Sequence, residues 1–563
     1  MRFVAPLVAL ALLALAVLPS ATPANAEFFA APAQGNLKIA PPLLARMTAD
    51  PLALEAVIVE MDHAVAPFGE QPNAQLARQA LALIAQQGQP VGALPIVGAA
   101  AGWVPAAGIQ ALSLLPGVAY IHDDAAIRPR PNASHGPAWP AGQLGSLYPR
   151  EIHADQVWTQ SRGSGIGVAV LDSGVAADAD LGNRVLASIS FAGPRSTLGD
   201  GGGHGTHVAG IIGGDGTRSQ GEYVGVAPQV NIVDVQVLDE RGSGRLSSVI
   251  GGLGWVVAHR QEYNLRVANL SFGAPAPPSY HADLLSSAVE LAWKQGIVVV
   301  TAAGNAGPTR GSVETPGIDP YAITVGAIDD QATLAVADDV LGWFSSWGTP
   351  VDGQPKPDLV APGRKIVSLR VPGSLLDQHL GDHVVTAKNG ASYFRLTGTS
   401  QACAVVSGAI ALVLQRHPEY TPDQVKMILL RTTQWYGGVS QLADPSAAGA
   451  GLLDAYAAFS SSSRGFANAG LRPADGAARR LFPLLFGQSL VWKDPLYRGM
   501  PWSAVNWTTI AWDNIAWDNI AWDSFNYSNI AWDNIAWDNI AWDNIAWDRA
   551  NWDNIAWDNI AWD

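Results

Sequence analysis

Between residues 147 and 460, short apolar runs alternate with longer stretches of helical periodicity, and this alternation strongly constrains the fold. The runs are apolar at nearly every position, as in strands of a parallel sheet that is covered on both faces. Among the helical stretches are Leu246–Arg260 and Ala282–Lys294, and Gly296 follows the second as a typical helix end. Strands separated by helices predict an α/β domain with a doubly wound, mainly parallel sheet. The predicted strands are Ile166–Leu171, Val230–Leu238, Arg266–Leu270, Ile297–Ala302 and Ala322–Ala327.

Three glycine-rich segments of this region each contain one chemically active side chain. They are Val-Leu-Asp-Ser-Gly around Asp172, Gly-His-Gly-Thr-His-Val-Ala-Gly around His204, and Gly-Thr-Ser-Gln-Ala around Ser400. A serine hydroxyl becomes an effective nucleophile when a histidine takes its proton and a carboxylate orients that histidine. Asp172 follows a predicted strand, where open α/β sheets carry functional groups. The segments therefore predict a catalytic triad, with the nearby His207 in a structural role.

The chain order Asp, His, Ser and the three segments resemble the signature motifs of the subtilisin-like serine proteases, the subtilases. The resemblance covers residues 147–460, over half of the chain, and its last recognisable part is Gly449–Ala458, which resembles the closing helix of the family. It implies the subtilisin-like fold and a serine endopeptidase that works through an acyl-enzyme. Ser400 is then the nucleophile, His204 the general base and Asp172 the carboxylate that orients His204. Taken singly, each segment is an ordinary turn, and only their order favours the protease.

Further segments resemble the subtilase oxyanion hole and substrate-binding strands. The resemblance of Ala-Ala-Gly-Asn at the end of a predicted strand implies that Asn305 and the backbone N–H of Ser400 bind the oxyanion. The alternative is an asparagine in a simple turn at the strand end. Glycine in strands that flank a substrate lets two backbones approach closely. The implied substrate-binding residues are Gly242, Ser243, Gly244, Ser271, Gly273 and Ala303.

Glu314 is a candidate specificity residue. Alignment of the nearby Val325-Gly326-Ala327 and of two prolines with the family pattern places Glu314 at the base of the primary specificity pocket. A carboxylate at that position favours Arg or Lys before the scissile bond, because opposite charges attract strongly in a partly buried pocket. The alternative is a surface carboxylate that pairs with Arg310 and contributes little.

Two residues close behind Ser400 bear on its chemistry. Ala404 stands where the family usually has proline. We expect a relaxed first helical turn and retained activity, with attack by amines on the acyl-enzyme, and thus peptide ligation, as a further hypothesis. Cys403 is the single cysteine, so an intramolecular disulfide is excluded. It is predicted to pack in the core, because a buried free thiol behaves as a small hydrophobe.

The first 135 residues predict export and a separate small domain. A basic start, an apolar stretch and Ala-Asn-Ala predict a signal peptide over residues 1–26. Residues 27–135 contain β-rich and helical stretches in the order of a small α+β, ferredoxin-like unit, which resembles the inhibitor-type propeptide of subtilases. Its predicted elements are Ala56–Met61, a helix through Leu76 and Ile84, Pro95–Val104, Ile109–Leu115 and Val118–His122. The Pro- and Gly-rich residues 128–145 are the predicted cleavage region.

The C-terminal end is an acidic repeat. Residues 461–500 are predicted to be a linker, and in residues 501–563 an aromatic residue recurs every fifth position. This tail carries ten Asp and one Arg, most of the chain's net charge of −15, which argues against nucleic acid as a partner. Two interpretations stay open: a solenoid that stacks Ile on Ile and Trp on Trp, or a flexible tail that binds a cell-surface polymer or other copies of itself.

The sequence thus predicts a secreted endopeptidase, held at the cell surface in one interpretation, with proteins or peptides as substrates and its own propeptide as an intramolecular inhibitor. The alternative is a surface-binding or self-assembling protein whose tail is the main functional part and whose protease domain chiefly processes itself. The chemistry needs no cofactor. Calcium is frequent in the family, but no carboxylate cluster matches a binding loop, so metal ligands are left unknown.

Overall fold

The computed structural model describes the N-terminal unit, the predicted catalytic domain and a short stretch after it. The described residues are 38–62, 72–127, 146–276, 280, 283–348, 355–438, 444–463, 465–471, 474, 521–522 and 555–556. The predicted signal peptide and cleavage region lie outside them, as do most of the predicted linker and all but four residues of the repeat tail. In the part of the chain that the structure describes, no helix is long and apolar enough to span a membrane.

The N-terminal unit is a four-stranded antiparallel sheet with strand order β2-β3-β1-β4. Its elements are α1 (Pro41–Ala49), β1 (Leu54–Met61), α2 (Pro72–Gln87), β2 (Gln89–Leu94), β3 (Ala99–Pro105), α3 (Ala106–Ser113) and β4 (Val118–Asp123). From β1 onward the order is β-α-β-β-α-β, as in a ferredoxin-like unit. The strand predicted over Pro95–Val104 begins only at Ala99, because Pro95 opens a short 3₁₀ turn, η3 (Pro95–Val97), and has no N–H for a ladder hydrogen bond.

The larger domain is built on a sheet with the order β13-β12-β11-β10-β6-β8-β7, in which β14 also pairs with β12. Its strands are β6 (Gly167–Asp172), β7 (Val185–Ser190), β8 (Asn231–Gln236), β10 (Leu265–Leu270), β11 (Val298–Ala302), β12 (Ile323–Asp329), β13 (Val340–Leu341) and β14 (Leu359–Pro362). All pairings are parallel except that of β13 with β12. The five predicted strands are confirmed, with ends shifted by at most two residues, and the fold is a doubly wound α/β domain.

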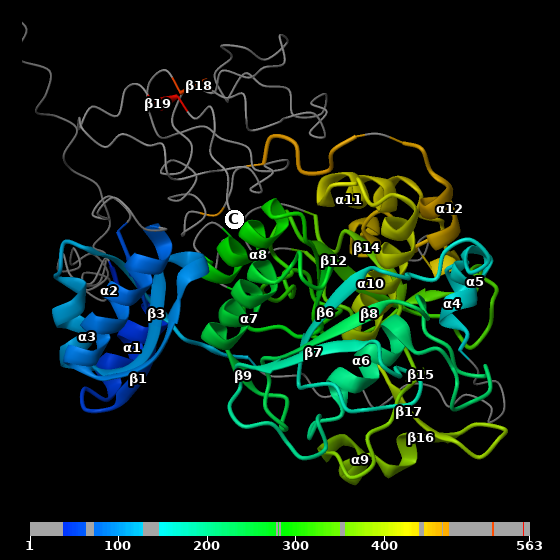
Figure 1. Ribbon diagram of the computed structural model, residues 1–563, viewed down its shortest axis with the longest axis horizontal. Helices are drawn as coiled ribbons and strands as arrows, with labels where there is room; N and C mark the ends of the chain where they lie inside the picture. The colour runs from blue at the N-terminus through cyan, green and yellow to red at the C-terminus, as the bar shows by residue number, and fades with distance from the viewer. Residues whose placement is uncertain are drawn as a thin grey trace, which may run out of the picture.

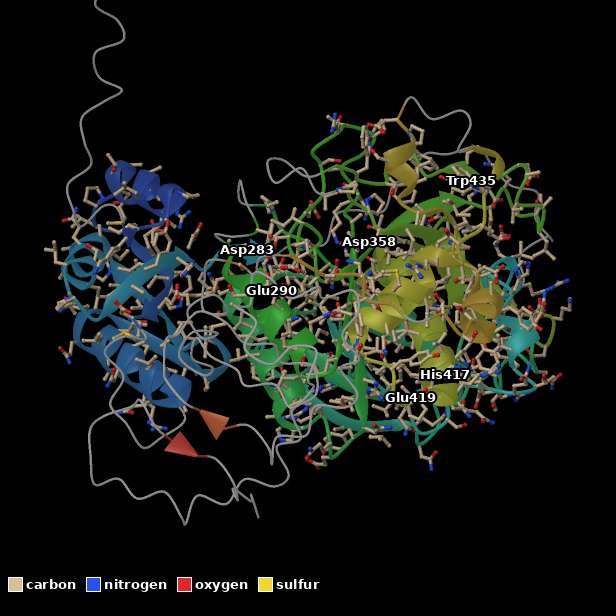
Figure 2. The ribbon with its side chains drawn as sticks, turned by 90° about the horizontal axis from the view of Figure 1, so that it is seen from above. Asp283, Glu290, Asp358, His417, Glu419 and Trp435 are labelled. Atoms are coloured by element: carbon tan, nitrogen blue, oxygen red, sulfur yellow. The ribbon has the colours of Figure 1, made fainter. Side chains whose placement is uncertain are left out.

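Helices cover both faces of this sheet. Among them are α6 (His204–Gly213), α7 (Leu246–Ala258), α8 (Leu284–Lys294) and α10 (Thr399–Arg416). Figures 1 and 2 show α7 and α8 between the N-terminal unit and the sheet. The helix predicted from Ala282 begins at Leu284, because the Asp283 side chain accepts hydrogen bonds from the N–H groups of Leu285 and Ser286 and so caps the helix.

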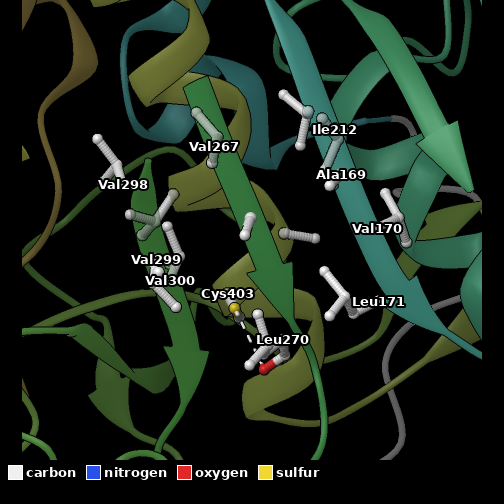
Figure 3. Close-up of a cluster of buried hydrophobic side chains, with 14 of the residues drawn as sticks. Ala169, Val170, Leu171, Ile212, Val267, Leu270, Val298, Val299, Val300 and Cys403 are labelled. Atoms are coloured by element: carbon white, nitrogen blue, oxygen red, sulfur yellow. Dashed lines mark hydrogen bonds between the residues drawn. The ribbon is translucent and has the colours of Figure 1, made fainter. Parts of the chain in front are cut away.

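The core packs branched side chains of the central strands against side chains of the helices α6 and α10. Figure 3 shows side chains of β6, β10 and β11 against Ile212 of α6 and Cys403 of α10. All of them are buried. Burial on both faces explains why these strands read as continuous apolar runs.

The remaining elements belong to the larger domain, except for one short strand of the N-terminal unit and one strand pair of the repeat tail. They are α4 (Tyr148–Glu151), α5 (Ala154–Val157), α9 (Leu375–His379), α11 (Pro422–Arg431), α12 (Ala455–Ser460), a small sheet of β15 (Ile366–Ser368), β16 (Val384–Thr386) and β17 (Ser392–Leu396), and the short pairs β5 (Ala126–Ile127) with β9 (Gly244–Arg245) and β18 (Ala521–Trp522) with β19 (Ile555–Ala556).

The chain after residue 448 differs from its prediction in two ways. The closing helix predicted over Gly449–Ala458 begins only at Ala455, because Leu452 bridges to Val360 and Gln434 in extended chain before Asp454 caps α12. Part of the predicted linker is packed: Phe466 is buried, and the N–H of Ala474 donates to both carboxylate oxygens of Glu290 on α8.

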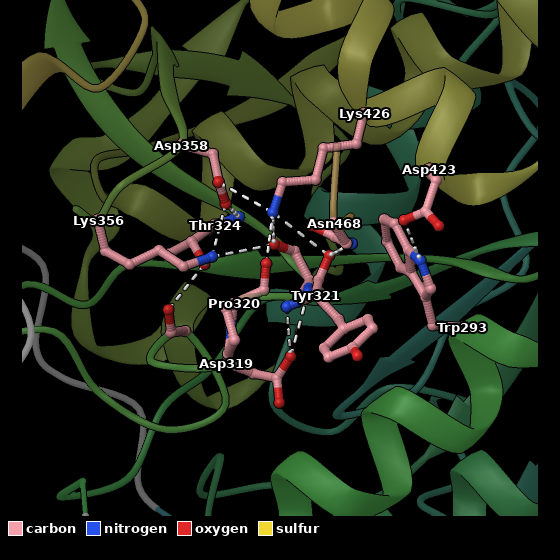
Figure 4. A network of polar contacts seen from close by, with 12 residues as sticks. Trp293, Asp319, Pro320, Tyr321, Thr324, Lys356, Asp358, Asp423, Lys426 and Asn468 are labelled. Carbon is pink, nitrogen blue, oxygen red and sulfur yellow. Dashed lines mark hydrogen bonds and ion pairs between the residues drawn. The ribbon is translucent and has the colours of Figure 1, made fainter. Parts of the chain in front are cut away.

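A buried polar network connects this C-terminal stretch to the sheet (Figure 4). Lys426 Nζ donates to three successive main-chain carbonyls, from Pro320 to Ala322, and lies 3.0 Å from Asp358 Oδ1. Lys356 Nζ lies 2.6 Å from Asp358 Oδ2. Burial lowers the pKa of Lys356 to about 8, although the Asp358 carboxylate opposes this shift. The Asn468 amide donates to the Tyr321 carbonyl, so residues after α12 are held by the same cluster.

Candidate active site

Asp172 and His204 form a hydrogen-bonded pair at the end of the central strand β6. After β6 the chain forms β7 and β8 on one side of this strand and then crosses to form β10 on the other side. The end of β6 is therefore a switch point, the place where open α/β sheets bind ligands. Asp172 is the last residue of β6, and His204 is the first of α6. Asp172 Oδ1 lies 2.8 Å from His204 Nδ1 and also accepts the N–H of Ser173.

The environment raises the pKa of His204 above its ordinary value. Burial lowers the pKa, but the charge and the hydrogen bond of Asp172 raise it by more, with a smaller contribution from Asp200. An Nδ1–H held by the carboxylate leaves Nε2 as the free base nitrogen. The pair therefore has the tautomer and the basicity that a general base requires.

Asp200 positions the start of α6, a role that the sequence reasoning missed. Its carboxylate accepts the hydroxyl of Ser173, the N–H of Gly203, and both the N–H and the hydroxyl of Thr206. Asp200 is fully buried, and burial raises its pKa despite these donors. Its position just before a glycine run and a helix start was the available signal, because aspartate there commonly accepts the free N–H groups of a helix.

Ser400 lies in the first turn of α10, and its hydroxyl is held by the neighbouring backbone. Ser400 Oγ donates to the Ser271 carbonyl at 2.8 Å, and this is its hydrogen bond among the described residues. The Ser400 hydroxyl therefore has to turn away from the Ser271 carbonyl before His204 can take its proton. Catalytic hydrogen bonds often form fully only when substrate is bound, so this resting geometry is compatible with a nucleophile.

Asn269, also missed by the sequence reasoning, supports the backbone of Ser400 through Ser271. Its Nδ2 donates to Ser271 Oγ at 2.8 Å, and Ser271 Oγ in turn donates to the Ser400 carbonyl at 2.9 Å. Asn269 Oδ1 accepts from Ser407 and Cys403 of α10. The three partners of Asn269 are buried, so the network holds the first turn of α10 against β10. Asn269 lies inside an apolar run, and a polar side chain there was the available signal.

Two hydrogen-bond donors lie beside Ser400 without partners among the described residues. The first helical N–H groups of α10, including that of Ser400, have no intrahelical acceptor. Asn305 Oδ1 accepts both the N–H and the hydroxyl of Thr399, at 2.9 and 3.0 Å. Because the amide oxygen is held in this way, Nδ2 of Asn305 is free to donate. An anion placed at the N-terminus of α10 meets both donors and the favourable end of the helix dipole.

Of the predicted substrate-binding residues, Ser271 contacts Ser400, and Gly242, Ser243 and Gly244 lie in and before the short strand β9. The backbone of β9 pairs antiparallel with β5 from the N-terminal unit, with Ile127 opposite Gly244 and Ala126 opposite Arg245. Gly242 and Ser243 form the turn that leads into β9. The segment thus already accepts an extended chain as an added strand.

Glu314 lies between the two segments that contain Gly273 and Gly304. A Cβ atom at Gly273 would overlap its carboxylate, and one at Gly304 would lie 3.0 Å from its Cγ. The N–H of Glu314 donates to the carbonyl of Ala303, so Ala303 also borders this position. Glu314 is only 6% exposed, which contradicts the alternative of a surface carboxylate.

His207, Cys403 and Ala404 are all buried. His207 Nε2–H donates to the carbonyls of Ile366 and Phe394, and burial lowers its pKa to about 3. It is therefore a neutral structural residue, as predicted. Burial raises the pKa of the Cys403 thiol to about 12, so the prediction of an inert core thiol is also confirmed. Ala404 continues α10 without a break. The residues that the structure describes contain no cluster of three His, Cys, Asp or Glu suited to a metal ion.

Comparisons with known proteins agree with this geometry. The model of the subtilase family matches residues 163–458, more than half of the chain. Serine protease AprX of Bacillus subtilis (strain 168) is 38% identical over 299 residues, which cover 52% of this chain and 66% of AprX, just under two thirds. Alkaline protease of Alkalihalobacillus alcalophilus is 33% identical over 352 residues, 62% of this chain and 76% of that protein. Subtilisin Savinase of Lederbergia lenta is 35% identical over 296 residues, 53% of this chain and 91% of that protein. The chain therefore belongs to the subtilase family and is a subtilisin-like serine protease.

Proposed function

We propose that the protein is an exported serine endopeptidase in which Ser400, His204 and Asp172 form the catalytic triad. The observation that carries this proposal is the Asp172–His204 pair at the end of β6, together with the hydrogen bond from Ser400 to Ser271, which directly follows β10, the strand that pairs with β6. The experiment that tests it is cleavage of a peptide library by the wild-type protein and by the Ser400→Ala variant.

The residues support a two-step mechanism. His204 Nε2 takes the hydroxyl proton as Ser400 Oγ attacks the peptide carbonyl carbon, and the tetrahedral oxyanion accepts hydrogen bonds from Asn305 Nδ2 and the Ser400 N–H. The C–N bond then breaks, and His204 returns the proton to the leaving amine. A water molecule, deprotonated by His204, hydrolyses the acyl-enzyme and restores the Ser400 hydroxyl. Asp172 keeps the tautomer of His204 and stabilises its charged form throughout.

Replacing Asn305 by alanine is expected to lower kcat by about 10²–10³ with little change in KM, because one donor to the oxyanion is lost. Steady-state kinetics on a peptide amide measure the effect. Since Asn305 also accepts two hydrogen bonds from Thr399, the variant should lose about 1–3 kcal/mol of unfolding free energy, which thermal unfolding measures, while the protein stays folded in the assay and the pH profile stays close to wild type. A loss confined to KM would contradict the role of oxyanion donor.

We further propose that Glu314 selects Arg or Lys at the substrate residue before the scissile bond. Its buried carboxylate lies against Gly273 of one predicted substrate-flanking segment and against Gly304, which directly precedes Asn305. A cationic side chain that reaches this carboxylate exchanges water for a charge partner in a low-dielectric setting.

The Glu314→Gln variant is expected to lower the preference for Arg over Phe at this position by about tenfold or more, since one partner of a buried charge pair is removed. The measurement is the ratio of kcat/KM for two peptides that differ only there. Glu419→Gln, a change of an exposed carboxylate, is the matched control. An unchanged ratio in E314Q, or a wild-type preference for apolar residues, would contradict the assignment.

The N-terminal unit has the contacts expected of an intramolecular inhibitor, and we propose this role for it. Its strand β5 pairs with β9 in the way that a bound substrate chain would pair. Asp124 accepts the N–H and the hydroxyl of Ser247 at the start of α7. Leu94 and Val97 belong to the same buried cluster as α7 and α8. A chain held in this way excludes substrates until it is cleaved and released.

Export and the role of the tail rest on the sequence, since residues 1–26 and nearly all of 501–563 lie outside the described residues. We retain the proposal that the tail binds a cell-surface polymer or other copies of the chain. Deleting residues 501–563 separates the two functions: an endopeptidase keeps its activity on unrelated peptides, whereas a tail-based binding protein loses its function.

A further inference from the structure

The pairing of β5 with β9 shows which enzyme side chain a bound chain meets. Ala126 lies directly opposite Arg245 in the antiparallel register. Directly opposed residues of such a pair point to the same side, with Cβ atoms about 4.5–5.5 Å apart. Any chain that replaces β5 in this register therefore places one side chain beside that of Arg245.

Arg245 has a long, charged side chain, whereas the three residues before it, Gly242, Ser243 and Gly244, are small and uncharged. Its guanidinium carbon lies 4.3 Å from the centre of the Trp103 ring, and Nη1 donates to the carbonyl of Asp124 at 3.2 Å. Trp103 and Asp124 both belong to the N-terminal unit. Within the described part of the chain, no carboxylate forms an ion pair with Arg245.

The partners of Arg245 thus leave together with the N-terminal unit. Once β5 is replaced by a substrate, the cation–π contact and the hydrogen bond to the Asp124 carbonyl are both lost. The released guanidinium keeps its charge and has five N–H donors for an acceptor at the same side of the substrate strand. A carboxylate is the side-chain group that best satisfies it.

We propose that Arg245 is a specificity-determining residue that favours Asp or Glu at the substrate position occupied by Ala126 in the present structure. The proposal rests on the proposed function, since it requires that a substrate replaces β5 on β9.

β5 runs from Ala126 opposite Arg245 to Ile127 opposite Gly244, that is, toward the turn at residues 239–243. A Cβ atom at Gly202, two residues before His204, would lie 3.2 Å from the carbonyl oxygen of Glu240 in that turn. A substrate strand with the same direction therefore passes Arg245 before it reaches the Asp172–His204 pair, which places this position upstream of the scissile bond. Together with Glu314, Arg245 gives the enzyme a preference for peptides with an acidic residue followed, further along, by a basic one.

The expected effect is moderate and depends on salt. Arg245 is half-buried beside solvent, so we expect kcat/KM for a peptide with Glu at this position to exceed that of its Gln counterpart by about fivefold. Raising the ionic strength should reduce the ratio, because screening weakens an exposed pair.

A peptide-library experiment tests the proposal. The full chain is expressed, the loss of the N-terminal unit is established by mass, and cleavage products are mapped for wild type, Arg245→Gln and Arg241→Gln. Arg241 is an exposed arginine at the turn before β9 and loses the same charge without facing the paired strand. Wild type and R241Q should show acidic residues enriched at one fixed position upstream of the cleaved bond, and R245Q should not. Glu and Gln versions of one cleaved peptide then give the ratio and its salt dependence.

The outcomes distinguish the two levels of inference. Cleavage without acidic enrichment in wild type, or enrichment that survives in R245Q, overturns the role of Arg245 and leaves the endopeptidase intact. If R241Q loses the enrichment as well, the effect comes from the overall positive charge near β9, and the specific role of Arg245 is also overturned. Absence of any Ser400-dependent cleavage after release of the N-terminal unit refutes the proposed function itself.

Discussion

Replacing Ser400 by alanine is expected to lower kcat for peptide hydrolysis by about 10⁶ while the fold is retained. The loss is this large because the other hydroxyl in the first turn of α10, that of Thr399, is held by Asn305 Oδ1 and by the N–H of Gly304 and so cannot replace the Ser400 hydroxyl. The deleted group makes a single hydrogen bond, to the Ser271 carbonyl, so the free energy of unfolding should change by only about 1 kcal/mol. Turnover of a peptide amide and thermal unfolding are the two measurements.

Two further observations make the Ser400 result specific. The Ser407→Ala variant removes another buried hydroxyl from the same helix, one that donates to Asn269, and it should remain active. In S400A the N-terminal unit should stay covalently attached, since its removal is proposed to need the same nucleophile. Retained hydrolysis in S400A would contradict the triad, and normal loss of the unit in an inactive S400A chain would contradict self-processing.

The Asp172→Asn variant is expected to lower kcat by about 10⁴ and to change the pH dependence of the remaining activity. An amide in place of Asp172 no longer holds the Nδ1–H tautomer of His204 and no longer stabilises the imidazolium. His204 acts as a base only when neutral, so wild-type kcat/KM rises as the pH increases through its raised pKa. Without the Asp172 charge that pKa falls, and the acid limb of the profile moves to lower pH.

The pH profile of kcat/KM, measured beside thermal unfolding, checks this prediction. Asp215→Asn is the matched control: Asp215 lies past the other end of α6, where it pairs with Arg184 at 3.6 Å. It changes the charge equally, but far from Nδ1 of His204, and should leave the profile in place. An acid limb that stays unshifted in D172N would show that Asp172 does not set the pKa of His204.

Much of the fold was predictable because local signals coincide in a parallel α/β domain. The five buried strands appear as apolar runs, since burial on both faces leaves no polar alternation. The errors arose at element ends and where pairing overrides local pattern: Pro95 opens a 3₁₀ turn before β3, and Leu452 pairs as extended chain ahead of α12. The packing of Ala474 against Glu290 has no local signal at all.

The sequence by itself determined the chemistry of the site, because Asp172, His204, Ser400 and Asn305 each lie in a short segment whose composition is tied to its role. Only the tertiary structure decided how these groups are held. Asp200 under α6, Asn269 behind Ser271, the burial of Glu314 and the contact of Arg245 with Trp103 all join residues that the strand order brings together. Ser271 and Ser400, for example, are 129 residues apart and hydrogen-bonded. Periodicity and local composition report on neighbours along the chain, whereas these contacts depend on which strands lie side by side, and that is settled by the packing of the whole sheet.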